Sequence, residues 1–386
     1  MQENNIKSVE QQESPKFLTK KKIIFGIIFI VILILVSTFT SIFFLGIDFN
    51  TITELGQKSL QGREWYLVGL IAVFIYYVLW SSYYLLINAR AYNVKAKWWE
   101  WILFGISTIF INGITPFAVG SEPYKIYWLT RHGLNSKDTL VVISSTSINW
   151  TFTQILITWP SFIIVSTHYN ELANSSSGFG LIAYWFSFGG MMMDIITMTI
   201  ILTMSYSSRF HVFVVSLYNQ ILKKFKRNYK TKEEIINEFR NELIFKKQYI
   251  REMKKIHVVI FQVVGTTLIA LTHYFAVYFA IQLLNVPGAA QMSFSDIFNI
   301  SNVAISGNNF VPIPGAEGSM QLILSEFIAA FAGTNSSIQL DKHELNQAIF
   351  VWRSFLFYLP VILGLIAFPI VIWQNVQIEK RHQKNN

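Results

Sequence analysis

The sequence predicts an all-α polytopic membrane protein with about six full spans and two re-entrant helical hairpins, arranged as an inverted-topology repeat. Three observations predict this fold. Of the 386 residues, 52% are hydrophobic and only 14% are charged, and the mean hydropathy is +0.40. Six uninterrupted apolar stretches reach the roughly 20 residues that a helix needs to cross a bilayer. Two further apolar stretches are broken in the middle by polar residues, Gly and Pro.

The composition also excludes several classes of protein. A disordered chain or a nucleic-acid-binding module would carry more charged residues, although the net charge here is +9. The chain has no cysteine, so disulfide frameworks, thiolate nucleophiles, zinc ribbons and iron–sulfur clusters are excluded. We find no nucleophile–base pair, no metal-ligand spacing and no Gly-Lys-Ser/Thr phosphate loop. We therefore expect no catalytic residue, no metal, no cofactor and no nucleic-acid partner.

The six predicted spans follow the uninterrupted apolar stretches. They are Ile23–Leu45, Trp65–Asn88, Thr139–Val165, Phe179–Met204, Ile256–Leu284 and Gln347–Trp373. The first is too long for the core of a signal peptide and is not followed by a small-residue cleavage site, so we interpret it as an anchor. Trp65, Trp98 and Trp373 lie at the ends of apolar runs, where aromatic side chains meet the membrane interface.

Each broken stretch leaves two apolar halves that are too short to cross alone. In Trp98–Ala118 the interruption consists of Asn112, Gly113 and Pro116. In Phe294–Ala332 it consists of Ser306, Gly307, Asn308 and Asn309, followed by Pro312, Pro314 and Gly315. Irregular backbone at membrane depth is tolerated only where it is buried in protein or lines a wet cavity. Both stretches are therefore predicted to be re-entrant hairpins that enter and leave on the same side.

The distribution of basic residues sets the predicted orientation. Residues Ser205 to Lys255 contain 13 Lys/Arg and 5 Asp/Glu, which is nearly the whole positive excess of the protein. With six crossings and two hairpins, both termini fall in the cytoplasm, and 27 of the 31 Lys/Arg residues lie on that side against 3 outside. This asymmetry agrees with the positive-inside bias of membrane proteins. We expect the basic loop to bind the anionic inner leaflet.

The predicted domain organisation follows from these elements. Residues 1–22 form a disordered cytoplasmic N-terminus, and residues 23–374 form the membrane domain, with a first half at 23–165 and a second half at 179–374. The basic cytoplasmic loop occupies residues 205–255, and residues 375–386 form a cytoplasmic tail. The first half begins inside and the second begins outside, which is the plan of many transporters.

The two breaks correspond residue by residue. Each has an Asn, three residues and a Pro, and later a Gly, one residue and a Glu. The matching residues are Asn112, Pro116, Gly120 and Glu122 in the first break, and Asn308, Pro312, Gly315 and Glu317, with Pro314 beside them, in the second. Such breaks free helix-terminal N–H and C=O groups at depth, where they can hold a charged substrate group. Paired breaks in the two halves indicate a transport site.

Ionisable residues inside the predicted spans extend this candidate site. Asp194 lies in the middle of one span and Arg353 near the start of the last. A buried charge of this kind is costly and indicates either function or pairing. One interpretation is a structural ion pair, formed between these two residues or with one of the Glu residues. The other is an acidic cavity with a fixed guanidinium, in which Arg353 binds a lipid phosphate and the carboxylates bind a cationic head group.

The third predicted span also has polar residues on one side. They include Ser144, Ser145, Thr146, Ser147, Asn149 and Gln154. Two interpretations stay open from the sequence: these side chains form hydrogen bonds between packed helices, or they line a cavity.

The residues around both breaks resemble the signatures of a known family. The stretch from Ile114 to Gly133, the stretch Pro312–Ser319, and Arg353 with Tyr358 and Pro360 resemble the lysylphosphatidylglycerol synthase transmembrane-region family, the flippase-like membrane domain of multiple peptide resistance factors. The departures are a short Gly315–Glu317 segment where the family has a longer Gly-rich run, and Gly120–Pro123, which reads Gly-Ser-Glu-Pro where many members have Gly-Gly-Gln-Pro. The resemblance covers residues 23 to 373.

The resemblance implies movement of a phospholipid between the leaflets of the cell membrane, with lysylphosphatidylglycerol as one candidate. The full-length synthases carry a soluble aminoacyltransferase domain after this region, and here 13 residues follow Trp373. We therefore expect a carrier and not an enzyme. Two alternatives stay open: the membrane part of a phosphatidylglycerol lysyltransferase that needs a separate catalytic chain, and a carrier of another small polar solute. The oligomeric state, including a homo-oligomer, is not determined by the sequence.

Overall fold

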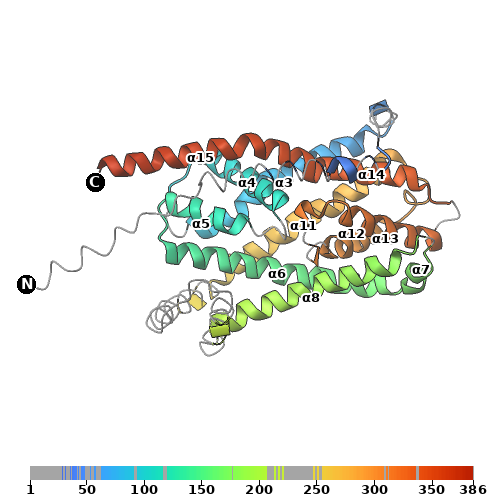
Figure 1. The fold of residues 1–386 in the computed structure, drawn as a ribbon, viewed down its shortest axis with the longest axis horizontal. Coiled ribbons are helices and arrows are strands. Elements are labelled where there is room, and N and C mark those ends of the chain that lie inside the picture. Colours follow the sequence, from blue (N-terminus) through green and yellow to red (C-terminus); the bar gives the residue numbers. More distant parts are fainter. Residues whose placement is uncertain are drawn as a thin grey trace, which may run out of the picture.

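The computed structural model describes residues 62–90, 94–115, 120–175, 177–206, 254–307, 310–311, 313–335 and 339–385. It also describes scattered residues between 28 and 57, 213 and 220, and 247 and 251. Within these ranges the chain forms helices joined by turns, and no strand occurs. The helices lie along one long axis as a bundle (Figure 1). The protein is thus an all-α polytopic membrane protein, as predicted.

Four long helices agree with predicted spans to within three residues. They are α3 (Glu64–Arg90), α6 (Ser136–Ser166), α8 (Gly180–Tyr206) and α11 (Ile256–Leu284). Each contains a long apolar window of the kind that crosses a membrane. Large apolar side chains such as Ile163 on α6 and Ile196 on α8 are exposed on the outside of the bundle, as expected for helices that face lipid.

The last span is longer than predicted and is not a single α-helix. It consists of α14 (Lys342–Arg353), a π-helical turn η5 (Ser354–Tyr358) and α15 (Leu359–Asn385). The helix continues past the predicted end of the span at Trp373, through most of the segment predicted as a cytoplasmic tail. The residues after Trp373 include Gln, Glu, Lys and Arg, which favour helix even where the apolar pattern stops.

Of the described helices, five are long and apolar enough to span a membrane. The first predicted span, Ile23–Leu45, falls largely outside the described residues. Two of its described residues, Thr40 and Leu45, are buried against the rest of the protein. Most of the predicted basic loop 205–255 and the predicted N-terminal segment 1–22 also fall outside the described residues.

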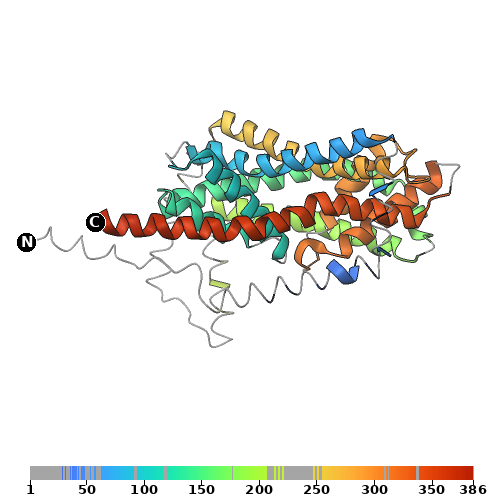
Figure 2. The same ribbon diagram turned by 90° about the horizontal axis from the view of Figure 1, so that it is seen from above.

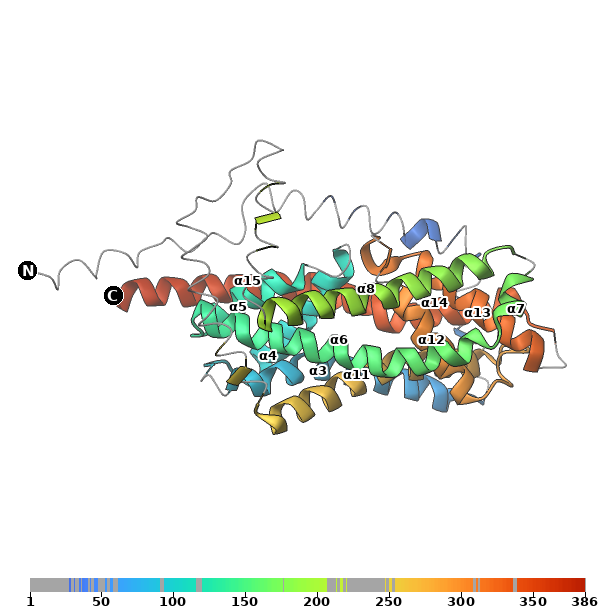
Figure 3. The ribbon, with the colours of Figure 1, turned by 90° about the horizontal axis from the view of Figure 1, so that it is seen from below.

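Two short helix pairs occupy opposite ends of the bundle. Helices α4 (Trp98–Ile114) and α5 (Ser121–Arg131) lie at the end where α6 begins and α15 ends, which we call the α5 end (Figures 1 and 3). Helices α12 (Phe294–Gly307) and α13 (Ser319–Asn335) lie at the opposite end, near the short helix α7 (Tyr169–Ala173), which we call the α7 end. Each pair enters from one end and returns to it, which is the predicted inverted arrangement of two hairpins.

The break in the first hairpin is not where the sequence placed it. Asn112 and Gly113 are helical, and α4 ends at Ile114. Thr115 has an extended backbone, with φ −113° and ψ 138°. A residue that precedes proline is disfavoured in the helical region, and Pro116 follows Thr115. The predicted range Trp98–Ala118 was also too short, because the returning arm is α5.

The apolar core of the described residues has two parts. The larger part joins α3, α11, α12, α13 and α14, with Phe327, Phe331 and Trp352 among its fully buried side chains. The smaller part joins α4, α5, the start of α6 and α15, around the packed rings of Trp101, Phe104 and Trp128, which are tilted or edge-on to one another. The long helices therefore hold each hairpin in a core of its own.

Polar side chains of α6 form hydrogen bonds between packed helices. Asn149 donates to Gln262 on α11, and Thr266 on α11 donates to Thr153 at 3.0 Å. Farther along, Thr158 donates to Asn302 on α12 at 3.1 Å. These groups are buried. Of the two interpretations of this polar face, the structure therefore favours helix packing over a cavity wall.

Candidate functional site

The two hairpin tips meet in the interior of the bundle, where the ring of Phe357 lies between them. Helix α4 packs against η4 (Pro314–Ala316), the short 3-10 turn that leads into α13. A Cβ atom added at Gly113 of the first tip would lie 3.2 Å from the Phe357 ring, and one at Gly315 of the second tip only 2.2 Å from it. The absence of side chains at these two glycines thus lets one aromatic ring contact both breaks. Figure 2 shows the bundle turned so that α15 runs across its front.

The backbone conformation at the second tip explains why glycine occurs at positions 315 and 318. Gly315 has φ +62° and Gly318 has φ +85°, values that suit glycine. Ala316, between them, also has a positive φ of 49°, which is uncommon for a residue with a side chain. The turn points the Gly315 carbonyl and the Glu317 side chain at the same guanidinium.

That guanidinium belongs to Arg353 on α14, which forms a buried ion pair with Glu317. The Nη2–Oε2 distance is 2.7 Å, and Arg353 and Glu317 are 5% and 2% exposed. Arg353 Nη2 also donates to the Gly315 carbonyl oxygen at 2.8 Å. The structure therefore brings together Gly315, Glu317 and Arg353, three of the residues predicted from the sequence, and it confirms pairing of Arg353 with one of the glutamates.

Two residues that the sequence did not single out as part of the site complete the coordination of Glu317. The Tyr358 hydroxyl donates to Oε1 at 2.6 Å, and Gln321 Nε2 donates to the same oxygen. Gln321 is itself fixed, because its Oε1 accepts from the Gly318 backbone N–H at 2.9 Å. One carboxylate oxygen thus faces the cation while the other is held by two neutral donors.

The π-helical turn explains why Arg353 and Tyr358 reach the same carboxylate. These residues are five apart, and in a regular α-helix residues five apart do not lie on one face. The Leu359 N–H donates to the Ser354 carbonyl, the five-residue step of a π-helix, which brings such positions closer together. Pro360 follows directly and has no N–H for the carbonyl four residues earlier, which favours a departure from α geometry here.

Arg353 retains unused donors. Among the described residues its buried Nε–H has no acceptor, and its Nη1 has the Met320 sulfur at 3.7 Å as a weak partner. The guanidinium carbon lies 4.0 Å from the centre of the Phe357 ring. A buried cation normally has its hydrogen bonds satisfied, so the spare donors of Arg353 are the feature of the described site that points to an anionic ligand.

The first tip also carries an acidic side chain, Glu122. Glu122 pairs with Lys125 one turn later on α5, with an Nζ–Oε1 distance of 2.8 Å, while its second oxygen is buried without a partner. The Gly120 N–H donates to the Thr115 hydroxyl at 3.2 Å. The side-chain oxygen of Asn112 is buried and unpartnered. Glu122 therefore forms a local pair and is not among the hydrogen-bonding partners of Arg353.

The remaining predicted site residues are placed elsewhere or are not described. Asp194 is half-buried on α8, whereas the hydrogen-bonding partners of Arg353 are Glu317, Gly315 and Met320. Pro314 begins the 3-10 turn beside Gly315. Pro116, Asn308 and Pro312 lie outside the described residues. The described residues include no group of three or more His, Asp or Glu that could hold a metal ion.

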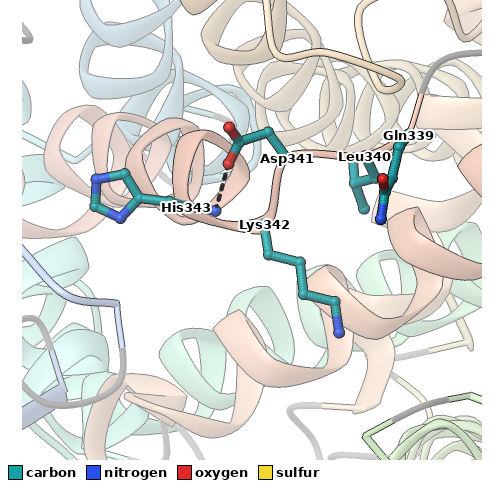
Figure 4. A pocket seen from close by; sticks show the side chains of 5 residues that line it. All are labelled: Gln339, Leu340, Asp341, Lys342 and His343. Carbon is teal, nitrogen blue, oxygen red and sulfur yellow. Dashed lines mark hydrogen bonds between the residues drawn. The ribbon is translucent and has the colours of Figure 1, made fainter.

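A shallow hollow lies away from this site, at the loop that leads into α14 (Figure 4). It is lined by Gln339, Leu340, Asp341, Lys342 and His343. The Asp341 carboxylate accepts from the His343 backbone N–H at 2.9 Å and caps the helix, so its chemistry is that of a helix start. The hollow is open to solvent and does not reach Arg353.

A family comparison identifies the chain. The model of the lysylphosphatidylglycerol synthase TM region matches residues 23–364. The chain belongs to this family. Two proteins are similar to it over nearly their whole lengths. They are the "uncharacterized protein MG306 homolog" of Mycoplasma pneumoniae, 34% identical over 96% of this chain and 94% of the relative, and "uncharacterized protein MG306" of Mycoplasma genitalium, 32% identical over 93% and 92%. The matched region includes both hairpins and the Glu317–Arg353 pair of this family member.

One histidine outside the membrane spans leads to a prediction of how the stability of the protein depends on pH. His132, between α5 and α6, is buried and stacks on Trp128, and its Nδ1–H donates to the Trp128 carbonyl at 2.8 Å. Burial lowers the pKa of His132 below its ordinary value, with smaller opposing effects from the Trp128 carbonyl and the Glu100 charge. The unfolded chain therefore binds the proton more tightly, and stability should fall as pH drops below about 6.5.

We expect the melting temperature of the purified protein in detergent to fall between pH 7.5 and pH 5.5, and to fall less in His132→Gln. The glutamine can still donate a hydrogen bond but does not titrate. An equal acid-side decrease in both proteins would show that other groups cause it.

Proposed function

We propose that this protein translocates phospholipid head groups between the leaflets of the cell membrane. The observation that supports the proposal most directly is the meeting of two oppositely inserted hairpins at a buried Arg353 with spare donors. The planar guanidinium of arginine can form two parallel hydrogen bonds with a phosphate, so the site is suited to bind a lipid head group. Membership of a lipid-handling membrane family agrees with this function. The acyl tails stay in lipid while the head group passes the hairpin tips.

Reconstitution into vesicles tests the proposal. Vesicles with a fluorescent lipid labelled in both leaflets are treated with a membrane-impermeant quencher, and the protected fraction is followed. Protein-dependent loss of protection is the expected result for at least one anionic, zwitterionic or lysylated lipid. Arg353→Lys should slow it strongly, because lysine keeps the charge that Glu317 needs but lacks the planar fork. Absence of exchange for every lipid would refute translocation.

The proposed orientation places both termini and the α5 end in the cytoplasm, with the basic segment 205–255 at the anionic inner leaflet. Because the chain has no cysteine, single cysteines can be introduced at the exposed positions Lys95, at the α5 end, and Asn174, at the α7 end. We expect a membrane-impermeant maleimide to label Asn174→Cys in intact cells and Lys95→Cys only after permeabilisation. Labelling of Lys95→Cys from outside would reverse the orientation.

The family name favours a second candidate, a part in lysylphosphatidylglycerol synthesis together with a separate catalytic chain. Incubation of the purified protein with phosphatidylglycerol and charged lysyl-tRNA tests whether this protein needs such a chain or catalyses the synthesis by itself. We expect no lysylated lipid from this protein by itself. Formation of that lipid would favour the enzymatic function.

A further inference from the structure

We propose that the Glu317–Arg353 pair is exchanged for a lipid that carries both a phosphate and an ammonium group, so that the site selects zwitterionic head groups. The inference rests on the proposed function and adds a substrate class to it. It also assigns Tyr358 and Gln321 as positioning residues that hold Glu317 during the exchange.

The first step concerns the cation. Arg353 Nη2 donates to Glu317 and to the Gly315 carbonyl. Within the described part of the chain, its Nε–H has no acceptor and its Nη1 has only the Met320 sulfur, at 3.7 Å. A phosphate that approaches the Nε–Nη2 edge of Arg353 can accept a hydrogen bond from the free Nε–H. It can also replace Glu317 Oε2 as the acceptor for Nη2. The result is a two-point contact between guanidinium and phosphate.

The second step concerns the carboxylate that is displaced. Glu317 Oε1 accepts from Tyr358 at 2.6 Å and from Gln321, and neither bond involves Arg353. Glu317 is buried, with 2% of its surface exposed. When the phosphate replaces Oε2 at Arg353, these two donors keep the carboxylate in place. Oε2 then lacks its cation and is directed at the newly bound head group.

Charge balance selects the head group. In the closed pair, one positive and one negative charge cancel in a buried environment. A phosphate alone would leave one negative charge uncompensated there, which is expensive in a low-dielectric interior. A head group that also carries an ammonium group supplies the missing positive charge to Glu317 Oε2. Phosphatidylethanolamine has this combination, whereas phosphatidylglycerol has the phosphate alone.

The test compares head groups on one acyl-labelled scaffold in the vesicle assay. For the unmodified protein we expect phosphatidylethanolamine to exchange at least about tenfold faster than phosphatidylglycerol, since the latter adds an unbalanced buried charge. Tyr358→Phe removes one hydroxyl and leaves the ion pair, so the protein should elute as a folded species. Its phosphatidylethanolamine exchange should be about tenfold slower, as expected for loss of a hydrogen bond to a charged group. Phosphatidylglycerol exchange should change much less.

The outcomes separate the two proposals. No exchange of any lipid refutes the proposed function and the inference with it. Exchange without head-group preference, or a Tyr358→Phe protein with the unmodified ratio, overturns the inference and leaves translocation standing. Radioactive inorganic phosphate added outside the vesicles distinguishes a free anion from a lipid as the source of the phosphate. We expect it neither to accumulate inside nor to slow lipid exchange, and accumulation would overturn the lipid assignment.

Discussion

Glu317→Ala is expected to destabilise the protein by about 3–5 kcal/mol, the cost of leaving a buried partner charge uncompensated. Arg353 is 5% exposed and has no other carboxylate among its hydrogen-bonding partners. Tyr358 and Gln321 lose their acceptor in the same variant. The melting temperature of the purified protein in detergent, followed by tryptophan fluorescence, should fall by several degrees. Lipid exchange should be lost.

The matched control removes both charges. In the double variant Glu317→Leu/Arg353→Met, no buried charge is left unpaired, and replacement of a buried ion pair by apolar residues is often neutral for stability. We expect its melting temperature to recover most of the loss while lipid exchange stays absent. Recovery of exchange would show that the pair serves only the fold. A single Glu317→Ala variant as stable as the unmodified protein would contradict the buried pairing itself.

Gly315→Ala is expected to be the second most damaging change, with a loss of stability and of exchange. Gly315 has φ +62°, and a left-handed backbone costs a residue with a side chain about 1–2 kcal/mol. The added methyl group would also lie 2.2 Å from the Phe357 ring, so the ring must move. That ring stacks on Arg353 and contacts the first hairpin at Gly113, so the displacement reaches both sides of the site.

Gly178→Ala provides a control with the same backbone requirement. Gly178 has φ +72°, and a Cβ atom there would meet nothing within 4 Å. Its melting temperature should therefore decrease by the backbone cost alone, and its lipid exchange should stay near that of the unmodified protein. Equal effects of the two substitutions would show that contact between Phe357 and the second tip is unimportant.

Much of the fold was predictable because hydropathy is a property that each residue contributes independently of its neighbours in space. The spans α3, α6, α8 and α11, and the division of two apolar stretches into short halves, follow from runs of apolar residues and from prolines. The prediction that each hairpin enters and leaves on the same side followed from the same pattern together with the distribution of basic residues. The break after Ile114 was placed too early, because Asn112 and Gly113 are tolerated in a helix and the proline acts on the residue before it.

The candidate site was predictable in composition but not in arrangement. The charged and glycine residues Gly315, Glu317 and Arg353 stand out in apolar surroundings, so the sequence alone identified them. Arg353 and its partner Glu317 are 36 residues apart in the chain, and the packing of α14 against the second tip brings them together. Only the tertiary structure shows that Glu317 is the acid that pairs with Arg353. Tyr358 lies in a stretch that resembles the family signature, but its role depends on a π-helical turn that shifts it onto the face of Arg353. Such a change in helical register arises from contacts between helices, and no local pattern of residues specifies it.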